Sequence, residues 1–258
     1  MTLVVAHRGA SAQAPENTLE AFRRAAEVGA DAVELDVHLA ADDQLAVIHD
    51  PDLARTTNHH GNVADMTMDE IRAADAGYTF ARSDDAGYPF RDRGLRVPTL
   101  PEVLEWLPDD LGLVVEIKAR AAVEPAVEAL RSHPVRQSGR ASLISFDEAS
   151  IEQAHALDPE LPTGYLLVPT QPIEPALVWA TEHGHAAVHP WDGDLGIDPA
   201  PILARALAYG RLVGCYVVDD PERMRQLAAY GLWGFVTNVP DLARTTLGPR
   251  QPDSRSPA

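Results

Sequence analysis

Histidine, arginine and carboxylate side chains stand at the ends of short apolar segments in the first half of the sequence. His7 and Arg8 directly follow the apolar run Leu3–Ala6, and His49 follows Leu45–Ile48. Histidine titrates near neutral pH, so His7 and His49 are candidates for a general acid and a general base. A lone histidine is more often a hydrogen-bonded core residue, but two at segment ends, in company with carboxylates, favour catalysis.

Three carboxylates accompany these histidines in an alternating pattern. Glu34 and Asp36 are two residues apart, as are Glu116 and Lys118, so each pair faces one side of a strand. Three inward carboxylates repel one another, and a bound divalent cation removes the repulsion. Oxygen ligands without cysteine favour a hard ion such as Mg²⁺ or Ca²⁺. The alternative is a set of structural ion pairs with Arg8 and Lys118, but two bases do not neutralise three carboxylates.

Two basic residues belong to the same pattern. The forked guanidinium of Arg8 suits the non-bridging oxygens of a phosphate group. Lys118 is the only lysine in a chain whose lysines and arginines total 21. Because lysine and arginine are not interchangeable where one compact charge is needed, this favours a functional role over the chance survival of a surface lysine.

Short apolar segments alternate with amphipathic helical segments along most of the chain. The expected strands are residues 3–6, 32–37, 45–49, 113–117, 142–145, 163–167, 186–189, 213–218 and 234–237. Repeated strand–helix units favour a parallel sheet wrapped by helices, and 258 residues suit one eight-stranded TIM barrel. Nine strands exceed this barrel by one. Too few residues for a helix separate the second and third strands, so we expect an antiparallel hairpin with one strand outside the barrel.

The rest of the chain fits one domain over residues 1–247. Residues 51–97 do not follow the repeat, and we expect a small insertion over one end of the barrel, after the second or third strand. Residues 248–258 are rich in proline, arginine and serine, which is typical of a disordered tail.

We expect Asn17 to cap the first helix. Active sites of TIM barrels lie at the carboxyl ends of the strands, so the predicted residues should converge there.

Composition narrows the class of partner. The net charge of −18 at pH 7 disfavours binding to nucleic acid or to anionic membranes. The single cysteine, Cys215, excludes an internal disulfide and a cysteine-based zinc cluster. The apolar run at the N-terminus is too short for a signal peptide or a membrane helix. We therefore expect a cytoplasmic protein without a membrane span, acting on a small molecule, whose oligomeric state the sequence leaves open.

Six short motifs occur in an order that resembles the glycerophosphodiester phosphodiesterase family. They are His-Arg-Gly at 7–9, Pro-Glu-Asn-Thr at 15–18, Glu-Leu-Asp at 34–36, His-Asp at 49–50, Pro-Thr-Leu at 98–100 and Glu-Ile-Lys at 116–118. The resemblance spans residues 3–245. One departure is Asn238, which stands where the closing motif of the family usually has aspartate.

The resemblance implies a TIM barrel that hydrolyses a glycerophosphodiester to glycerol 3-phosphate and an alcohol, within lipid and glycerol metabolism. It implies an acid–base pair of His7 and His49, phosphate or charge-stabilising groups at Arg8 and Lys118, and divalent metal ligands at Glu34, Asp36 and Glu116. The residues leave two routes open: direct attack by water, or attack by the substrate's own hydroxyl through a cyclic phosphate, which the resemblance favours.

Two other functions compete with this hydrolase. A related phosphodiesterase of the lysophospholipase D type would need an apolar, membrane-facing rim, which the acidic charge disfavours. A non-catalytic phosphodiester-binding barrel would be expected to lack one of the histidines or carboxylates. The sequence leaves open the leaving alcohol, the preferred cation and the order in which the histidines act.

Overall fold

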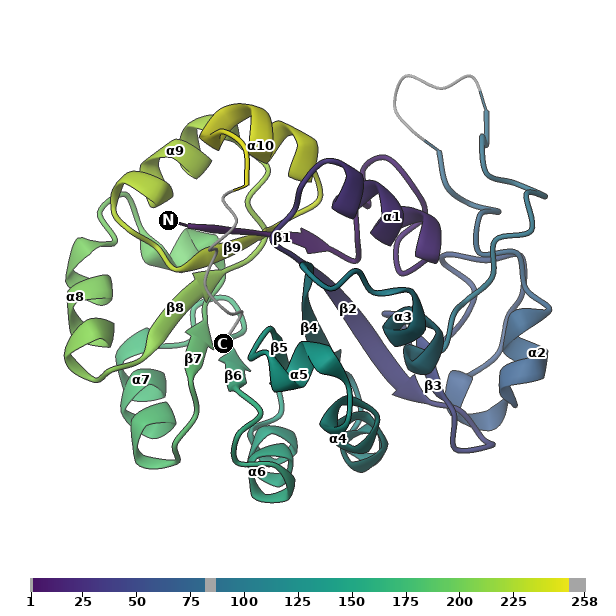
Figure 1. Ribbon diagram of the computed structural model, residues 1–258, viewed down its shortest axis with the longest axis horizontal. Coiled ribbons are helices and arrows are strands. Elements are labelled where there is room, and N and C mark those ends of the chain that lie inside the picture. The colour runs from purple at the N-terminus through teal and green to yellow at the C-terminus, as the bar shows by residue number, and fades with distance from the viewer. Residues whose placement is uncertain (1, 82–86, 251–258) are drawn as a thin grey trace.

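The computed structural model describes residues 2–81 and 87–250. The barrel strands are β1 (Leu3–His7), β2 (Ala32–Leu39), β4 (Gly112–Ile117), β5 (Ala141–Ser145), β6 (Thr163–Leu166), β7 (Ala187–His189), β8 (Leu212–Cys215) and β9 (Gly234–Thr237). Within the described residues, these eight parallel strands close into a ring in the order β1, β9, β8, β7, β6, β5, β4, β2, with β2 returning to β1 (Figure 1). The expected TIM barrel is confirmed.

The ninth strand forms the expected hairpin. β3 (Leu45–Val47) runs antiparallel to β2 outside the ring, with Val37 opposite Val47. Beyond the last pair, the backbone N–H of Ile48 donates to the carbonyl oxygen of Asp36 at 3.0 Å. This contact extends the alignment from the hairpin end of β2 back to Asp36, and His49 follows directly.

Helices cover the outside of the ring (Figure 1). They are α1 (Leu19–Glu27), α3 (Leu100–Trp106), α4 (Val123–Arg131), α5 (Pro134–Gln137), α6 (Glu148–Leu157), α7 (Ile173–Glu182), α8 (Ala200–Ala208), α9 (Pro221–Ala229) and α10 (Pro240–Leu247), with α2 (Met68–Arg72) in the insertion. Short 3₁₀ turns η1 (Val63–Asp65), η2 (Arg120–Ala122) and η3 (Asp192–Leu195) lie in the loops.

Side-chain caps fix where several helices begin. Thr99 forms a capping box with Glu102 at the start of α3, and Asp147 accepts from Ser150 N at the start of α6. The cap of α1 is Thr18, whose hydroxyl accepts from Ala21 N. The prediction that Asn17 caps this helix is therefore wrong by one residue, and its side chain serves another purpose described below.

The alternation predicted for β2 and β4 is borne out. Leu35 and Ile117 pack with Phe22 and other apolar side chains in the core between strands and helices. Burial of each such side chain stabilises the fold by about 1.5–3 kcal/mol. The alternate residues of these strands face the barrel interior, and Asp36 lies opposite Glu116 in the β2–β4 pairing. One face of each strand therefore builds the core while the other carries the polar groups.

Residues 51–81 and 87–97 pack a small core of their own beside the hairpin. Leu53, Val63, Met68 and Ile71 are buried together with Ile48, which follows β3. Figure 1 shows α2 and its loops at the side of the molecule that carries β3. The insertion is thus attached to the end of the hairpin from which His49 extends.

The two ends of the described chain meet at the barrel. β1 pairs with β9 through residues 3–6 and 234–237. At the amino-terminal end of the strands, Arg244 on α10 donates to Gly29 O at 2.7 Å and forms an ion pair with buried Asp31. Asp31 also accepts from Val4 N at 2.7 Å. Contacts far apart in sequence therefore close the ring.

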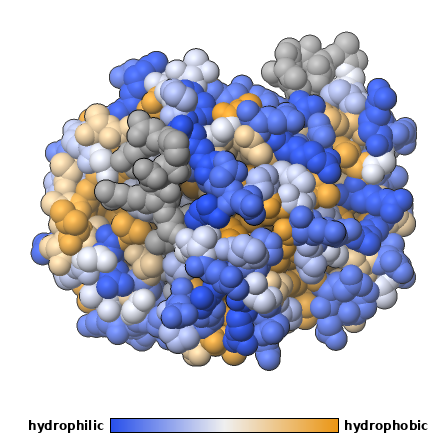
Figure 2. Space-filling model, in the orientation of Figure 1, coloured by the Kyte–Doolittle hydropathy of each residue, from blue (hydrophilic) through white to orange (hydrophobic). Residues whose placement is uncertain are grey.

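No helix among residues 2–81 and 87–250 has the length and apolar character needed to cross a bilayer. Hydrophilic residues dominate the face seen in Figure 2, while hydrophobic residues gather over α8 at the left, where Leu207 is exposed. Of the tail expected to be disordered, residues 251–258 lie outside the described part, and Arg250 contacts Asp110.

Candidate functional site

A tight turn after β1 sets the first two polar residues. Arg8 has φ of 56° and Gly9 has φ of 84°. A Cβ atom at Gly9 would lie 2.6 Å from the backbone carbon of Ala21, so only glycine fits against α1 here. The turn directs the backbone N–H of Arg8 to Glu34 Oε2 at 3.0 Å. Strain of this kind in a non-glycine residue is common at functional sites.

Three carboxylates from two adjacent strands meet inside the barrel mouth. Glu34 and Asp36 come from β2, and Glu116 comes from the carboxyl end of β4. All three are buried, and one oxygen from each lies within 4.8 Å of the others. Such a group of oxygen donors has the spacing and chemistry of a divalent cation site.

The ionisation of this cluster supports the same conclusion. Burial, then the charges of Asp36 and Glu116, raises the pKa of Glu34 well above its usual value. Burial and Asp36 also raise the pKa of Glu116 to about 7. Burial opposes ionisation of Asp36, but Lys118 and Arg8 outweigh it and lower the pKa of that carboxyl. The protein's own charges therefore stabilise one carboxylate out of three.

Two bases border the carboxylates without neutralising them. Lys118 Nζ lies 2.5 Å from Glu116 Oε1 and 3.0 Å from Asp36 Oδ1. Arg8 Nε lies 3.2 Å from Asp36 Oδ2. Asp36 Oδ1 and Arg8 Nε are buried, yet neither has a partner in hydrogen-bond geometry among the described residues. An additional cation beside the cluster would satisfy the remaining carboxylate lone pairs.

Asn17 connects the first loop to this cluster. Its Nδ2 donates to Asp36 Oδ2 at 2.8 Å, and its Oδ1 accepts from Asp36 N at 3.3 Å. The side chain is buried and its φ is 56°, a conformation that asparagine tolerates better than most residues. Asn17 therefore orients the central carboxylate instead of capping α1.

His7 is held by a chain of hydrogen bonds from the last loop of the barrel. Its Nδ1 lies 2.7 Å from Asn238 Oδ1, which also accepts from Ser11 Oγ at 3.0 Å. The amide nitrogen of Asn238 donates to Asp219 Oδ2 at 2.6 Å, so the amide oxygen is the group that faces His7. An oxygen acceptor requires the proton on Nδ1 and leaves Nε2 free. Burial, then Arg8, lowers the pKa of His7 to about 4, so the ring is neutral near pH 7.

His49 is held by a carboxylate. Its Nδ1 lies 2.6 Å from Asp50 Oδ1, so this ring also keeps Nε2 free. Burial lowers the pKa of His49, while Asp36 and Asp50 act in the opposite direction. The Arg55 guanidinium, followed by His49, lowers the pKa of Asp50 and keeps it ionised. Both histidines thus have Nε2 available for proton transfer, but an amide oxygen holds Nδ1 of His7 and a carboxylate holds Nδ1 of His49.

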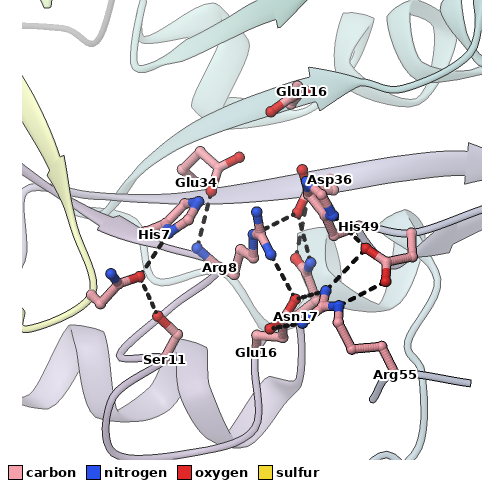
Figure 3. A network of polar contacts seen from close by, with 12 residues as sticks. His7, Arg8, Ser11, Glu16, Asn17, Glu34, Asp36, His49, Arg55 and Glu116 are labelled. Atoms are coloured by element: carbon pink, nitrogen blue, oxygen red, sulfur yellow. Dashed lines mark hydrogen bonds and ion pairs between the residues drawn. The ribbon is translucent and has the colours of Figure 1, made fainter. Parts of the chain in front are cut away.

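Arg55 of the insertion joins these groups into one network (Figure 3). Its Nε donates to Asp50 Oδ2 at 2.7 Å, and its two terminal nitrogens each donate to Glu16 at 2.7 Å. Glu16 in turn accepts from Arg8 Nη1 at 2.8 Å. The insertion therefore contacts the residue that holds His49 and the residue that holds Arg8.

These side chains surround a cavity of about 230 Å³ with two unlike walls. The polar wall consists of His7, Arg8, Glu34, His49, Glu116 and Lys118. The apolar wall consists of Ile144, Phe146, Leu166, Tyr216, Val217 and Val236. The cavity can hold a small molecule with a charged end and a less polar remainder.

The structure brings all seven sequence-predicted residues together, with Asp36 directly behind the wall that the other six form. Sequence reasoning did not assign roles to Asn238, Asp50 and Arg55. Asp50 was detectable as a carboxylate next to a candidate histidine. Asn238 was noticed only as a departure from the closing motif, and Arg55 carries no local signal, because each reaches its partner only through the fold.

Comparisons with known proteins agree with this geometry. A family model described as "Glycerophosphoryl diester phosphodiesterase family" matches residues 7–242. A glycerophosphodiester phosphodiesterase of Caldanaerobacter subterraneus subsp. tengcongensis is 35% identical over 246 residues, covering 93% of this chain and 95% of its own length. One from Bacillus subtilis is 32% identical over 252 residues, covering 93% of this chain and 84% of its own length.

Solved structures show the same likeness. A phosphodiesterase of Oleispira antarctica, solved in complex with its product sn-glycerol-3-phosphate, has a TM-score of 0.84 at 26% identity and covers 96% of this chain and 97% of its own. A glycerophosphodiester phosphodiesterase of Agrobacterium tumefaciens has a TM-score of 0.81 at 29% identity, covering 95% of this chain and 100% of its own.

Proposed function

The chain belongs to the glycerophosphoryl diester phosphodiesterase family and is an enzyme that cleaves glycerophosphodiesters, and we propose that His7, His49 and a bound divalent cation carry out this cleavage. The observation that carries the proposal is the convergence of two oriented histidines and a cluster of three buried carboxylates, two of which line the cavity with the histidines. The products would be glycerol 3-phosphate and an alcohol, as the product bound to the Oleispira relative suggests.

The residues fit a divalent cation. Glu34, Asp36 and Glu116 would hold it, because their oxygens converge and the neighbouring bases leave them undercompensated. All-oxygen ligands favour Mg²⁺ or Ca²⁺ over softer metals. When bound, the cation supplies positive charge beside the reacting phosphoryl oxygens.

Arg8 and Lys118 would bind the phosphate. Both line the polar wall, and each is already ionised through its contact with Asp36. A guanidinium pairs with two non-bridging oxygens, whereas an ammonium places one compact charge. Together they would orient phosphorus between the two histidines and stabilise the charge that develops there.

The two histidines would share the proton transfers. One histidine, unprotonated at Nε2, would remove the proton of the attacking hydroxyl, and the other, in its imidazolium form with both ring nitrogens protonated, would donate its Nε2 proton to the leaving alcohol. We propose that the attacking group is the substrate's own 2-hydroxyl, which gives a cyclic glycerol phosphate that water then opens with the roles reversed. Orientation of an intramolecular nucleophile can contribute about 7–11 kcal/mol to lowering the barrier. Across the described residues, no serine or cysteine stands in the cavity lining as an alternative nucleophile.

The assay that tests the function uses purified protein with glycerophosphocholine, glycerophosphoethanolamine and a lysophospholipid, each with and without EDTA. Release of glycerol 3-phosphate from the first two, lost with EDTA and restored by Mg²⁺ or Ca²⁺, is expected. Preferential cleavage of the lysophospholipid would instead indicate a lysophospholipase D activity, and full activity without metal would overturn the role of the cation.

A substitution distinguishes the loss of cation binding from a loss of folding stability. Glu34→Gln should weaken cation binding and turnover while leaving thermal stability without metal unchanged or higher, because burial disfavours the charge that is removed. Glu222→Gln is the matched control, since Glu222 is an exposed partner of Arg225. Equal activity of the two variants would remove Glu34 from the proposed ligands.

The route through a cyclic phosphate has its own test. Phosphorus NMR of the reaction should show a transient cyclic species, and a substrate without the 2-hydroxyl should be cleaved at a negligible rate. Hydrolysis of this deoxy substrate at the natural rate would establish direct attack by water.

A further inference from the structure

Three histidines and a glutamate gather far from the cavity, at the end of the barrel where the strands begin. Glu152 and His155 lie one turn apart on α6, and His183 and His185 flank Gly184 just before β7. Glu152 Oε1 forms an ion pair with His183 Nδ1 and lies 3.8 Å from His185 Nε2. The rings of His155 and His185 are 5.5 Å apart between centroids.

His185 is the unusual member of this group. Its side chain is fully buried, and Nδ1 lies 2.8 Å from Thr163 Oγ1. Nε2 points toward Glu152 but has no hydrogen-bond partner among the described residues. A threonine hydroxyl can donate or accept, so Thr163 satisfies Nδ1 in either tautomer and Nε2 is the unsatisfied atom in both. A buried polar atom without a partner is rare in proteins, and a bound ion is one way to satisfy it.

The surrounding residues keep the imidazoles in place. Trp179 on α7 stacks against His185 and His183, with centroid distances of 4.7 Å and 5.1 Å. His155 Nε2 lies so close to the intervening loop that a Cβ on Gly184 would be 3.1 Å from it. Burial lowers the pKa of His185 to about 4, so its ring is neutral near pH 7, which is the form that binds metals.

We propose that Glu152, His155, His183 and His185 form a second metal site, for a divalent transition ion such as Zn²⁺. Imidazole and carboxylate ligands suit this class of ion, whereas the all-oxygen cluster in the barrel mouth suits a hard one. If the hydroxyl of Thr163 accepts from Nδ1–H, it fixes the tautomer whose Nε2 lone pair is available, in the manner of outer-shell partners at known metal sites.

Side chains must move before all four ligands reach one ion, because the rings of His183 and His185 lie nearly parallel with their centroids 6.3 Å apart. Two imidazoles on one tetrahedral ion have centroids about 5 Å apart, and two ligand atoms at about 2 Å from it lie at most about 4 Å from each other. The distances of 5.5 Å between His155 and His185 and of 3.8 Å between Glu152 Oε1 and His185 Nε2 are close to these values. The ion pair between Glu152 and His183 must open, and both side chains are about two-fifths exposed, at 42% and 41%.

The site would act on stability and not on the reaction. It lies at the end of the strands opposite to the cavity, where residues of TIM barrels serve the fold. An ion held by Glu152 and His155 on one side and His183 and His185 on the other would fasten α6 to the segment between α7 and β7. Because the ligands of this site prefer a transition ion, Zn²⁺ binding to it can be measured while Mg²⁺ saturates the carboxylate cluster in the barrel mouth.

The test is a calorimetric titration of Zn²⁺ into the whole 258-residue chain in excess Mg²⁺, together with melting temperatures. The variants are the double substitution His155→Ala/His183→Ala, Glu34→Gln, and His60→Ala as a control histidine on the surface of the insertion. His185 is left in place because it is buried, and circular dichroism verifies the folding of each variant.

We expect one Zn²⁺ to bind to the wild type, to Glu34→Gln and to His60→Ala, and to raise their melting temperatures. The double variant should bind this ion at least about 100-fold more weakly, with unchanged phosphodiesterase activity in Mg²⁺. If the wild type binds no Zn²⁺, if the double variant binds it equally well, or if Glu34→Gln alone removes the event, the proposal is wrong.

Discussion

Arg55 and Glu16 meet in a two-point ion pair with both nitrogen–oxygen contacts at 2.7 Å, although 39 positions separate them in the sequence. The same guanidinium donates to Asp50, which holds His49. Glu16 in turn accepts from Arg8. A single residue of the insertion thus supports one proposed acid–base group, His49, and one proposed phosphate-binding group, Arg8.

Arg55→Ala should therefore lower kcat by about 10–100-fold, as expected for loss of a residue that orients groups in contact with substrate. KM should rise as well, because Arg8 loses the support of Glu16. Arg72→Ala is the matched control, since Arg72 forms an ion pair with Glu102 in the same region but outside the cavity. Steady-state kinetics of both variants provide the measurement.

Arg55→Lys should recover only part of the rate, because one ammonium cannot bridge Asp50 and Glu16 with the geometry of a fork. If Arg55→Ala and Arg72→Ala have the same small effect, the network is structural and Arg55 does not position the site.

Asn238→Ala should reduce kcat on the order of 10–100-fold by releasing the ring of His7. The methyl group offers no acceptor for Nδ1–H, so both the tautomer and the orientation of the ring are lost. Ser11→Ala should cost much less, because Ser11 contacts only the oxygen of Asn238. Comparable rates for the two variants would show that His7 does not depend on this amide.

Lys118→Arg should fold normally and lose about 100-fold in kcat, similar to the loss of one preorganised donor. A single Nζ contacts both Glu116 and Asp36, and the longer, flat guanidinium cannot place its charge at that point. Arg120→Lys, at an exposed pair with Asp147, is the reciprocal control and should have no effect. Wild-type rates in Lys118→Arg would exclude a role that requires a compact charge.

His189 should make the protein sensitive to acid. Burial lowers its pKa from 6.5 to about 4, and Nε2 has no hydrogen-bond partner among the described residues. The unfolded chain binds the proton more readily between these values, so stability decreases as the pH falls from 6.5 toward 4. By pH 5 this single group would cost the fold about 2 kcal/mol.

His189→Leu should remove this contribution, so the variant should lose less stability than the wild type between pH 7 and pH 5. Urea unfolding at the two pH values gives the difference directly, and His60→Ala serves as an exposed control. If the wild type and His189→Leu lose the same free energy of unfolding between pH 7 and pH 5, the buried ring does not determine the acid sensitivity of the fold.

The periodicity of apolar residues predicted most of the fold, and the polar residues at the strand ends predicted most of the candidate site. The β2–β3 hairpin followed from a connection too short for a helix, and the convergence of His7, Glu34 and Glu116 followed from the geometry of parallel strands. Asn17 was misassigned because a cap and a loop asparagine look alike until Asp36 is placed beside it. The grouping of His155 with His185 was missed because it joins two connections that no periodic pattern relates.

The pairing of β1 with β9 has a consequence for synthesis of the chain. The first strand emerges from the ribosome long before residues 234–237 exist, so one of its edges stays without a partner until these residues have been made. Asn238, which orients His7, arrives immediately afterwards. Barrel closure and completion of the proposed acid–base pair are therefore nearly simultaneous. A nascent chain that stops short of β9 holds every carboxylate of the cluster but lacks the amide that orients His7.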